Sequence, residues 1–286
     1  MAFSQYLING LLLGGLYACI AVGFSLVWGV LNVVNMLHGA SVVLGAYFTF
    51  YGVQKLGLPI YVVMPSVCAI LFVLGYGIQR GLINRVIGQP ILITLTLTFG
   101  LELIVNNLIL HYFTATPQSL MVNWGSIQIL GTQISTVRLG GMLVAGALTL
   151  LLFWLLYHSR IGRAIVAVRM DRHAAALMGI RIPQIYALTF GIGALMAAAA
   201  GCAVALIYPV TPTMSGLFLG KAFVICVLGG LGSVPGAIIG GLVLGLVESA
   251  GTIFLGPEWS ISLGFVIMII VIVFFPNGLA GKKGYE

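Results

Sequence analysis

The polar side chains that could do chemistry are few in this sequence, and the densest group lies in one apolar segment, residues 91–112. Thr94, Thr98, Glu102 and Asn106 are each four residues apart, so an α-helix places them along one side. An ionisable side chain at membrane depth is costly, which makes a substrate or ion pathway the first hypothesis for this stripe. The alternative is that the hydroxyls and the amide join neighbouring helices, with Glu102 protonated or near the headgroups. The sequence leaves both interpretations open.

A second set of candidates for the pathway lies in a short polar stretch near the N-terminus, residues 32–39. It contains Asn35, His38 and Gly39, and it is too short and too weakly charged for an ordinary loop. Non-helical backbone is tolerated within a membrane only where protein or a water-filled cavity surrounds it. The stretch therefore predicts a break between two membrane helices, and its three residues join the pathway candidates.

The last third of the chain adds two charges, Lys221 and Glu248, in or near apolar helices. Each either lines the pathway, for which Glu248 is a candidate, or extends to the membrane surface. Glycine spacing in residues 232–245 predicts close helix contacts of the GxxxG kind. Residues 216–222 and 230–236 resemble nucleotide-binding loops, but their spacing is wrong. We therefore expect this chain to bind no nucleotide itself.

Residues 159–184 form the most basic segment of the chain and lie between two long apolar runs. The segment holds Arg160, Arg163, Arg169, Arg172 and Arg181, together with Asp171, the only aspartate. By the positive-inside rule it lies in the cytoplasm. Its alanine-rich centre, residues 164–178, predicts one continuous helix.

The two sides of this predicted helix differ in chemistry. One side holds Arg169, Arg172 and His173, and the opposite side holds Ala167, Asp171, Ala174, Ala175 and Met178. A surface of small side chains with a single carboxylate suits the groove of another protein. The alternative is a loop that fixes the topology and contacts anionic headgroups. The alanine side favours the first interpretation, because a topology signal alone does not need it.

The composition places these segments in a membrane. Of the 286 residues, 61% are hydrophobic and 6% are charged, and the mean hydropathy is +1.18. These values exclude a soluble globular protein and are typical of all-α proteins with several membrane helices. The net charge of +7 comes mostly from basic residues in short loops beside apolar runs, so it does not indicate a nucleic-acid-binding surface.

The residue types of catalytic and metal sites are scattered along the chain. The histidines, His38, His111, His158 and His173, lie singly, and neither HExxH nor GxSxG is present. The cysteines, Cys19, Cys68, Cys202 and Cys226, each lie in an apolar run without CxxC spacing, which predicts buried thiols. We expect no catalytic site, no metal site and no enzyme.

Apolar runs separated by loops predict about nine membrane crossings, with eight to ten as the range, in a single domain over residues 1–286. The predicted spans are residues 6–31, 40–53, 60–78, 91–112, 139–157, 184–208, 220–228, 236–255 and 260–275. Residues 113–138 form the longest outer loop, whose alternating pattern predicts a hairpin. Arg80, Arg85, the basic segment and the Lys282–Lys283 tail mark the cytoplasmic side. An odd count then leaves the N-terminus outside and the C-terminus in the cytoplasm. The start of the chain does not resemble a removed signal peptide.

Three segments carry a resemblance to a known family, the inner-membrane permeases of ATP-binding-cassette importers for branched-chain amino acids. Residues 9–40 resemble the opening of these permeases, where Asn35, His38 and Gly39 match an Asn-Phe-Ala-His-Gly signature and Met36 and Leu37 replace its middle pair. Residues 162–180 resemble the helix that docks on the ATPase subunits, and residues 229–249 resemble the glycine-rich signature near the C-terminus. The resemblance covers nearly the whole chain.

This resemblance implies an importer subunit in the bacterial inner membrane that moves branched-chain or related amino acids. Two separate ATPase subunits would bind ATP and magnesium, a periplasmic binding protein would deliver the substrate, and a second permease, a paralogue or another copy, would complete the path. Arg163, Asp171, Ala175 and Gly179 are then expected to couple this chain to the ATPases. The carboxylate would meet a cation, the alanine would allow close approach, and the glycine would end the helix.

Two other functions remain open from the sequence. Importers of urea and short-chain amides have similar permeases. An ion-driven secondary transporter would carry coupling carboxylates near mid-membrane and inverted repeats, whereas this chain offers Glu102 and Glu248 and no convincing repeat. A scaffold without transport activity is a weaker third alternative.

Overall fold

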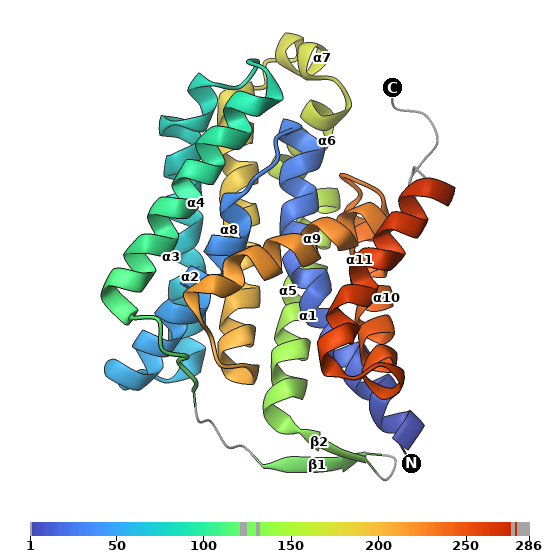
Figure 1. Ribbon diagram of the computed structural model, residues 1–286. Coiled ribbons are helices and arrows are strands. Elements are labelled where there is room, and N and C mark those ends of the chain that lie inside the picture. Colours follow the sequence, from blue (N-terminus) through green and yellow to red (C-terminus); the bar gives the residue numbers. More distant parts are fainter. Residues whose placement is uncertain (1, 121–124, 130–131, 276–277, 279–286) are drawn as a thin grey trace.

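The computed structural model describes residues 2–120, 125–129, 132–275 and 278, and the Lys282–Lys283 tail lies outside this described part. Within this part the fold is all-α apart from one hairpin, as the composition predicts (Figure 1). The elements in chain order are α1 (Ala2–Leu31), α2 (Leu37–Phe50), the π-helical turn η1 (Tyr51–Lys55), α3 (Ile60–Gly81), η2 (Ile83–Arg85), α4 (Ile91–Phe113), β1 (Ser126–Ile129), β2 (Thr132–Ser135), α5 (Thr136–His158), α6 (Arg160–Met170), α7 (Arg172–Leu177), α8 (Ile182–Ile207), η3 (Pro212–Met214), α9 (Ser215–Gly229), α10 (Val234–Phe254) and α11 (Pro257–Phe274).

Seven helical segments among the described residues are long and apolar enough to cross a membrane, and a shorter apolar helix covers residues 258–274. The N-terminal end of α1 and the β-hairpin lie at one end of the molecule, whereas α6, α7 and the C-terminal end of α11 lie toward the other (Figure 1). An odd number of crossings would produce this arrangement. The count of nine and the orientation of the termini stay predictions.

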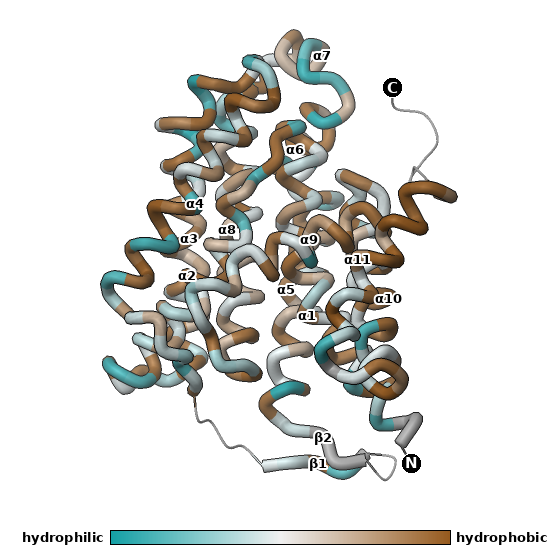
Figure 2. The backbone as a smooth tube through the Cα atoms, viewed as in Figure 1, coloured by the Kyte–Doolittle hydropathy of each residue, from teal (hydrophilic) through white to brown (hydrophobic). Residues whose placement is uncertain are grey.

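The predicted outer hairpin is present, and its two strands pair antiparallel with Ser126 opposite Ser135. The four cysteines are free and buried, as predicted from their apolar surroundings. Hydrophobic residues cover most of the long helices in Figure 2, while hydrophilic residues gather around α6 and α7. This distribution agrees with a membrane-embedded bundle and a water-exposed α6–α7 segment.

The centre of the bundle is held together by glycines that bring helix backbones into contact. At Gly14 of α1, an added Cβ would lie 2.8 Å from the Leu242 Cα of α10, and at Gly241 it would lie 2.6 Å from the Ala18 Cα. At Gly45 of α2 it would lie 2.9 Å from the Ala198 Cα of α8. These contacts confirm the predicted role of the glycine spacing and leave no room for a side chain at these points between the helices.

Candidate functional site

The polar stripe of α4 faces the interior of the chain and contacts the break between α1 and α2. The chain leaves α1 at Asn32, whose φ is +52°, and it remains non-helical until α2 begins at Leu37. The Thr98 hydroxyl donates a hydrogen bond to the Val34 carbonyl (3.1 Å) and accepts one from the Met36 amide (3.3 Å). A break at membrane depth needs such partners for its backbone groups, and α4 supplies them.

Two turns further along α4, the stripe meets the first residue of α9. The Asn106 Nδ2 donates to the Ser215 Oγ (2.9 Å), and the Glu102 carboxyl lies beside both side chains. Gly39 of α2 lies directly against the Ser215 carbonyl. Thr98, Glu102, Asn106 and Ser215 are called the polar seam below.

Glu102 is buried in the polar seam without a cation. Its residue is 7% exposed, and no basic side chain among the described residues lies within 4 Å of the carboxylate. The carboxyl lies next to the N-terminal end of α9, where the unpaired amides of a helix favour negative charge. This arrangement gives the seam a buried acidic group whose electrostatic partner is a helix end rather than a fixed positive side chain.

The candidates in the first break do not all lie at the seam. The prediction that His38 and Gly39 belong to non-helical backbone is wrong, because both lie in the first turn of α2. His38 faces α1, where its Nε2 is 2.9 Å from the Ile20 carbonyl and its ring packs against Phe24. Asn35 lies in the break itself and is buried. Gly39 contacts the seam at Ser215.

Glu248 lies elsewhere, in a buried cluster on the α10 side of the protein. Its Oε2 is 2.9 Å from the Lys221 Nζ and accepts a hydrogen bond from the Tyr17 hydroxyl (2.7 Å). The Lys221 Nζ also donates to the Tyr17 hydroxyl and lies 4.3 Å from the centre of that ring. Lys221 and Glu248 are 6% and 4% exposed, so the alternative that either side chain extends to the membrane surface is wrong.

Sequence reasoning missed this pairing, although a signal was present. Lys221 and Glu248 are the two charges in the apolar run from 215 to 254, and opposite charges in membrane helices usually pair. The third member, Tyr17, is 204 residues from Lys221, and nothing in the sequence near Tyr17 indicates it. We call Tyr17, Lys221 and Glu248 the charge cluster.

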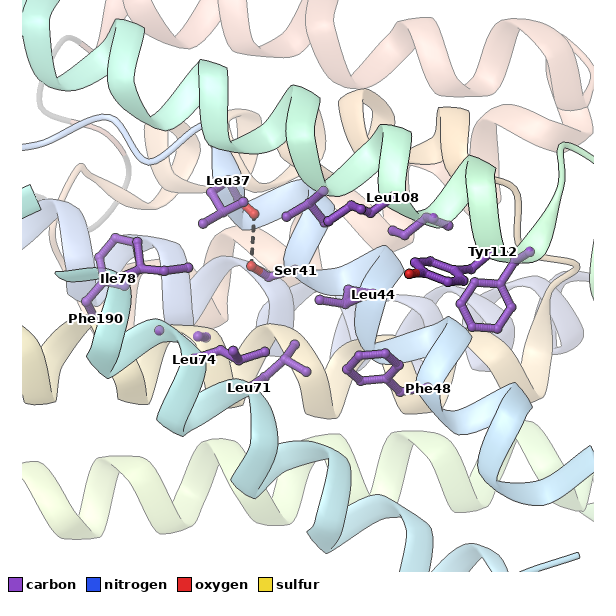
Figure 3. Close-up of a pocket in the computed structure, with 15 residues that line it drawn as sticks. Leu37, Ser41, Leu44, Phe48, Leu71, Leu74, Ile78, Leu108, Tyr112 and Phe190 are labelled. Atoms are coloured by element: carbon purple, nitrogen blue, oxygen red, sulfur yellow. Dashed lines mark hydrogen bonds between the residues drawn. The ribbon is translucent and has the colours of Figure 1, made fainter. Parts of the chain in front are cut away.

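An apolar cavity of about 360 Å³ lies between α2, α3, α4 and α8 (Figure 3). Leucine side chains such as Leu44, Leu71 and Leu108 line it, and Phe48 and Tyr112 are at one end. The Ser41 hydroxyl in its wall donates to the Leu37 carbonyl (2.9 Å). The cavity separates α4 from α3. The packing contacts of α4 with the rest of the protein are therefore mainly those with α2 and those of the polar seam.

The basic segment is helical but not continuous, so the prediction of one helix over residues 164–178 is wrong. Asp171 has φ −154° and ψ 110°, which ends α6 and starts α7. Its carboxylate accepts hydrogen bonds from the amides of His173 (2.7 Å) and Ala174 (3.0 Å), and these bonds lower the pKa of the carboxyl below its usual value. The side chain therefore caps α7 in its ionised form.

The break at Asp171 also changes which side chains the segment presents. Ala175 is buried against its own chain at 4% exposure, whereas Leu177 and Met178 are 89% and 82% exposed. Of the predicted small-residue side only Ala175 is buried, whereas Asp171, Ala174 and Met178 are exposed, and the outer surface of α7 carries the two large apolar side chains of Leu177 and Met178. Gly179 follows with φ +81°, which confirms that it ends the helix.

Further arginines lie within the basic segment and beside it. The Arg163 guanidinium is exposed and lies 3.5 Å from the His158 carbonyl at the end of α5. Beside α7, a groove of about 540 Å³ is lined by Arg80, Asn84 and Arg181, among others. The surface around the apolar tip of α7 is therefore basic.

Comparison with known proteins agrees with this architecture. The model of the family described as "Branched-chain amino acid transport system / permease component" matches residues 6–273. The high-affinity branched-chain amino acid transport system permease protein LivH of Salmonella typhimurium is 33% identical, over 99% of this chain and 97% of its own. The corresponding protein BraD of Pseudomonas aeruginosa is 32% identical over the same shares.

A fructose import permease protein, FrcC of Rhizobium meliloti, is 27% identical over 82% of this chain and 66% of its own. No solved structure matches the chain. The family model and the first two relatives each span nearly the whole sequence, and the long apolar helices agree with a multi-pass protein of the inner membrane. The chain therefore belongs to the family of permease components of branched-chain amino acid transport systems.

Proposed function

We propose that this chain is a membrane-spanning subunit of an ATP-driven importer for branched-chain amino acids. The observation that carries the proposal is the match of the family over residues 6–273, together with relatives of that printed function over 99% of the chain. The fructose permease covers less of both chains, which favours amino acids over sugars. The family match also favours this function over an ion-driven transporter.

The ATPase partners are inferred from the cytoplasmic surface. Two ATPase subunits would bind ATP and magnesium, and this chain would contribute the tip of α7 to one of them. Leu177 and Met178 are exposed large hydrophobic side chains, and Arg80 and Arg181 line the groove beside α7. Hydrophilic residues gather around α6 and α7 (Figure 2). Exposed apolar side chains within a polar rim are typical of protein-binding surfaces. In the docking hypothesis they replace Ala175, which its own chain covers.

A second permease subunit, a paralogue or another copy, is inferred from the outward side of α4. Of the seven long apolar spans it is the least covered by its own chain, with 17% of its most apolar window buried, yet it also exposes Thr96 and Asn107. An added Cβ at Gly100, between them, would contact nothing within 4 Å. An amide facing lipid is unfavourable, whereas an amide and a glycine facing another helix promote association. The substrate path would then pass between the two subunits, and a periplasmic binding protein would dock at the hairpin end.

Reconstitution tests the function directly. The permease, its partner subunits and the binding protein are placed in vesicles, and ATP-dependent uptake of labelled leucine is measured. We expect uptake that unlabelled isoleucine or valine suppresses and that urea, acetamide and fructose do not. Suppression by urea or acetamide would support the amide importer instead, and uptake driven by a sodium or proton gradient without ATP would contradict the proposal.

The α7 tip is tested by co-purification of the ATPase subunits at equal permease abundance. Leu177→Glu places a charge in the proposed contact, and losing one well-packed interface position costs about 2 kcal/mol or more. Recovery of the ATPases should therefore fall more than about tenfold. Arg172→Gln, which starts the same helix, should have a mild effect. Equal recovery with both variants would mean that α7 is only a topology signal.

The role of Asp171 is separated by two substitutions at the same position. Asparagine caps a helix about as well as aspartate, whereas alanine does not. If Asp171 acts as the cap of α7, Asp171→Asn should keep ATPase recovery and Asp171→Ala should lower it. A loss with asparagine as large as that with alanine would instead support the hypothesis that the carboxylate meets a cation of the partner.

The second permease is tested by disulfide cross-linking in a background without the four native cysteines. Asn107→Cys on α4 is compared with Leu143→Cys on α5, which is also exposed and lies at a similar distance from the hairpin end of its helix. We expect oxidation to join permease subunits through position 107 and not through 143. Cross-linking at neither position, or equally at both, would contradict the assignment of α4 to the interface.

A further inference from the structure

The apolar cavity between α2, α3, α4 and α8 has no part in the proposed function. Its volume of about 360 Å³ is more than twice that of an apolar protein cavity that binds benzene, about 150 Å³. Elsewhere in the bundle the helices approach to backbone contact, as α1 and α10 do at Gly14. α3 and α4 instead pack on α2 and make almost no direct contact with each other. The space between them is therefore large enough for a bound molecule.

The cavity opens on the lateral surface of the bundle, between α3 and α4. On its inner side Leu37, Leu71 and Ile109 are buried, whereas Leu74 of α3 and Leu108 of α4 are exposed. Both helices are apolar spans that the rest of the chain leaves mostly uncovered. In a membrane this opening faces hydrocarbon.

The proposed second permease does not cover the opening. Thr96, Gly100 and Asn107, which carry that interface, lie on another side of α4. At 3.6 residues per turn, Leu108 is about 100° and Tyr112 about 140° around the helix from Asn107. A partner subunit on the Asn107 side therefore leaves the space between α3 and α4 open to lipid.

The walls of the cavity are unsuited to a polar occupant. The side chains that line it carry two polar groups, the Ser41 hydroxyl and the Tyr112 hydroxyl. The first already donates to the Leu37 carbonyl (2.9 Å), and the second lies at one end (Figure 3). An amino acid would have no counter-charges there, and a buried water needs about two to four polar partners. The cavity thus suits a hydrocarbon chain better than the transported substrate.

The cavity is elongated along the helices. Its wall on α2 runs from Leu37 to Phe48, which is about 16 Å at 1.5 Å per residue. Ile78 and Phe190 lie at one end and Phe48 and Tyr112 at the other (Figure 3). The hydrocarbon core of a bilayer is about 30 Å thick. The cavity therefore has the length of a chain in one leaflet.

The Tyr112 end of the cavity has the chemistry of a membrane surface. Beside exposed Tyr112, the Phe113 ring lies 4.9 Å from the Tyr47 ring and 6.2 Å from the Tyr51 ring. Tyrosines are enriched at the interface between membrane and water. Tyr51 begins η1 and Lys55 ends it, and the exposed ammonium of Lys55 suits a lipid phosphate. This end is therefore the headgroup end of the site.

We propose that the cavity binds one acyl chain of a membrane phospholipid, which enters between α3 and α4 with its headgroup at the Tyr112 end. The chain fills the space that the side chains of α3 and α4 leave between them, so a lipid completes the packing of α4. This site is separate from the polar seam, and the proposal does not rest on the proposed function.

Photocrosslinking in vesicles tests the site. The permease, purified with the subunits that accompany it, is reconstituted with a small fraction of phosphatidylethanolamine that carries a diazirine in the middle of one acyl chain. After illumination, labelled peptides are identified by mass spectrometry. Every residue of α2 is buried or partly buried, so bulk lipid labels the surfaces of α3 and α4 but not α2. We expect label on α2 between Leu37 and Phe48.

A matched pair of substitutions separates the cavity from the rest of the surface. Ser41 donates to the carbonyl four residues earlier in its helix (2.9 Å), and Ser66 of α3 does the same (2.8 Å), but Ser66 is exposed outside the cavity. Ser41→Phe fills the cavity and leaves no room for a chain, so label on α2 should fall at least about tenfold. Ser66→Phe should leave it unchanged.

Two additions keep the test decisive. Ser41→Leu fills less of the cavity than Ser41→Phe, so it replaces that variant if Ser41→Phe does not assemble, and label on α2 should then fall severalfold. Saturating leucine, added to the unmodified protein, should leave the label on α2 unchanged, because the substrate does not occupy this cavity.

Three outcomes would overturn the inference. The first is label confined to α3 and α4 in the unmodified protein, and the second is equal label on α2 with and without the substitution at Ser41. The third is loss of this label on addition of leucine, which would assign the cavity to the substrate. None of these measurements depends on uptake. A failure of leucine transport therefore contradicts the proposed function and leaves the lipid site to be decided by the label alone.

Discussion

Helices α1 and α4 both span the bundle, but they are attached to it in opposite ways. The most apolar window of α1 is 83% buried and contacts α10 through glycine backbones, whereas the corresponding window of α4 is 17% buried. α4 is held instead by polar contacts, among them Thr98 with the break and Asn106 with Ser215. Close backbone packing is rigid, and isolated hydrogen bonds are easier to exchange. α1 and α10 therefore form a fixed core. α4 forms a wall of the bundle whose hydrogen bonds to its neighbours can rearrange.

The two carboxylates of the membrane helices follow the same division. Glu248, in the fixed core, is paired with Lys221 and Tyr17. Glu102, on the α4 side, lies beside Ser215 and Asn106, and it forms no ion pair with a basic side chain of the described residues. An ion pair whose members satisfy each other holds helices together. A carboxylate without a fixed counter-charge can take part in a changing set of contacts, which is what a transport pathway requires.

Replacing each carboxylate by leucine should give the largest difference between the two regions in the amount of folded permease. Glu248→Leu leaves Lys221 buried without its partner, which costs about 3–5 kcal/mol, so little folded permease should accumulate in the membrane. Glu102→Leu removes an isolated acidic group, so the permease should insert and assemble normally while leucine uptake falls. Abundance by quantitative blot and uptake in the same vesicles measure both effects. Normal uptake by Glu102→Leu would mean that the stripe only joins helices.

A matched glycine substitution should produce an intermediate effect. In Gly241→Ala the new Cβ would lie 2.6 Å from the Ala18 Cα, so α1 and α10 must separate, and such overpacking costs about 1–3 kcal/mol. In Gly100→Ala on α4 the new methyl group meets nothing within 4 Å, and the change removes a helix penalty of up to about 1 kcal/mol. Thermal unfolding of the purified permease should show a lower midpoint for the first variant and an unchanged or higher one for the second. Equal destabilisation of both would contradict the division into core and wall.

The smallest expected effect comes from the threonines of α4. Thr98→Val removes the hydrogen bonds to Val34 and Met36, which together contribute about 1–2 kcal/mol. Thr94→Val is the control, since the Thr94 hydroxyl donates to the Ile91 carbonyl of its own helix (2.9 Å). We expect a midpoint lower by a few degrees for Thr98→Val and almost no change for Thr94→Val. If the two variants unfold alike, the contact between α4 and the break does not stabilise the fold.

Several features of the site follow from local sequence patterns. Thr98, Glu102 and Asn106 share a face because four-residue spacing brings side chains together on any α-helix. The break near Asn35 and the end of α7 at Gly179 follow from polar residues in an apolar run and from the ability of glycine to adopt positive φ. Each of these properties depends on residues within a few positions of one another, so reading along the chain is sufficient.

The prediction of one continuous helix failed because a side chain binds backbone amides in place of the helical hydrogen bonds. Asp171 was expected within a continuous helix because its neighbours are good helix formers, but its carboxylate binds two amides and ends α6 instead. After the break Ala175 is buried, while Leu177 and Met178 lie outside. Helix propensity is a weak preference, and one short polar side chain with two backbone partners outweighs it.

The sequence determined that this is an all-α membrane protein, roughly where its helices run, and which face of α4 is polar, because composition and periodicity are local properties. The tertiary structure alone decided that Glu248 pairs with a cation while Glu102 pairs with none among the described residues, and that His38 faces α1 rather than the polar seam. It also brought Tyr17 to Lys221 across 204 residues. Such contacts depend on how whole helices pack. Glycine spacing indicates that helices pack closely, but it does not indicate which distant side chains come into contact.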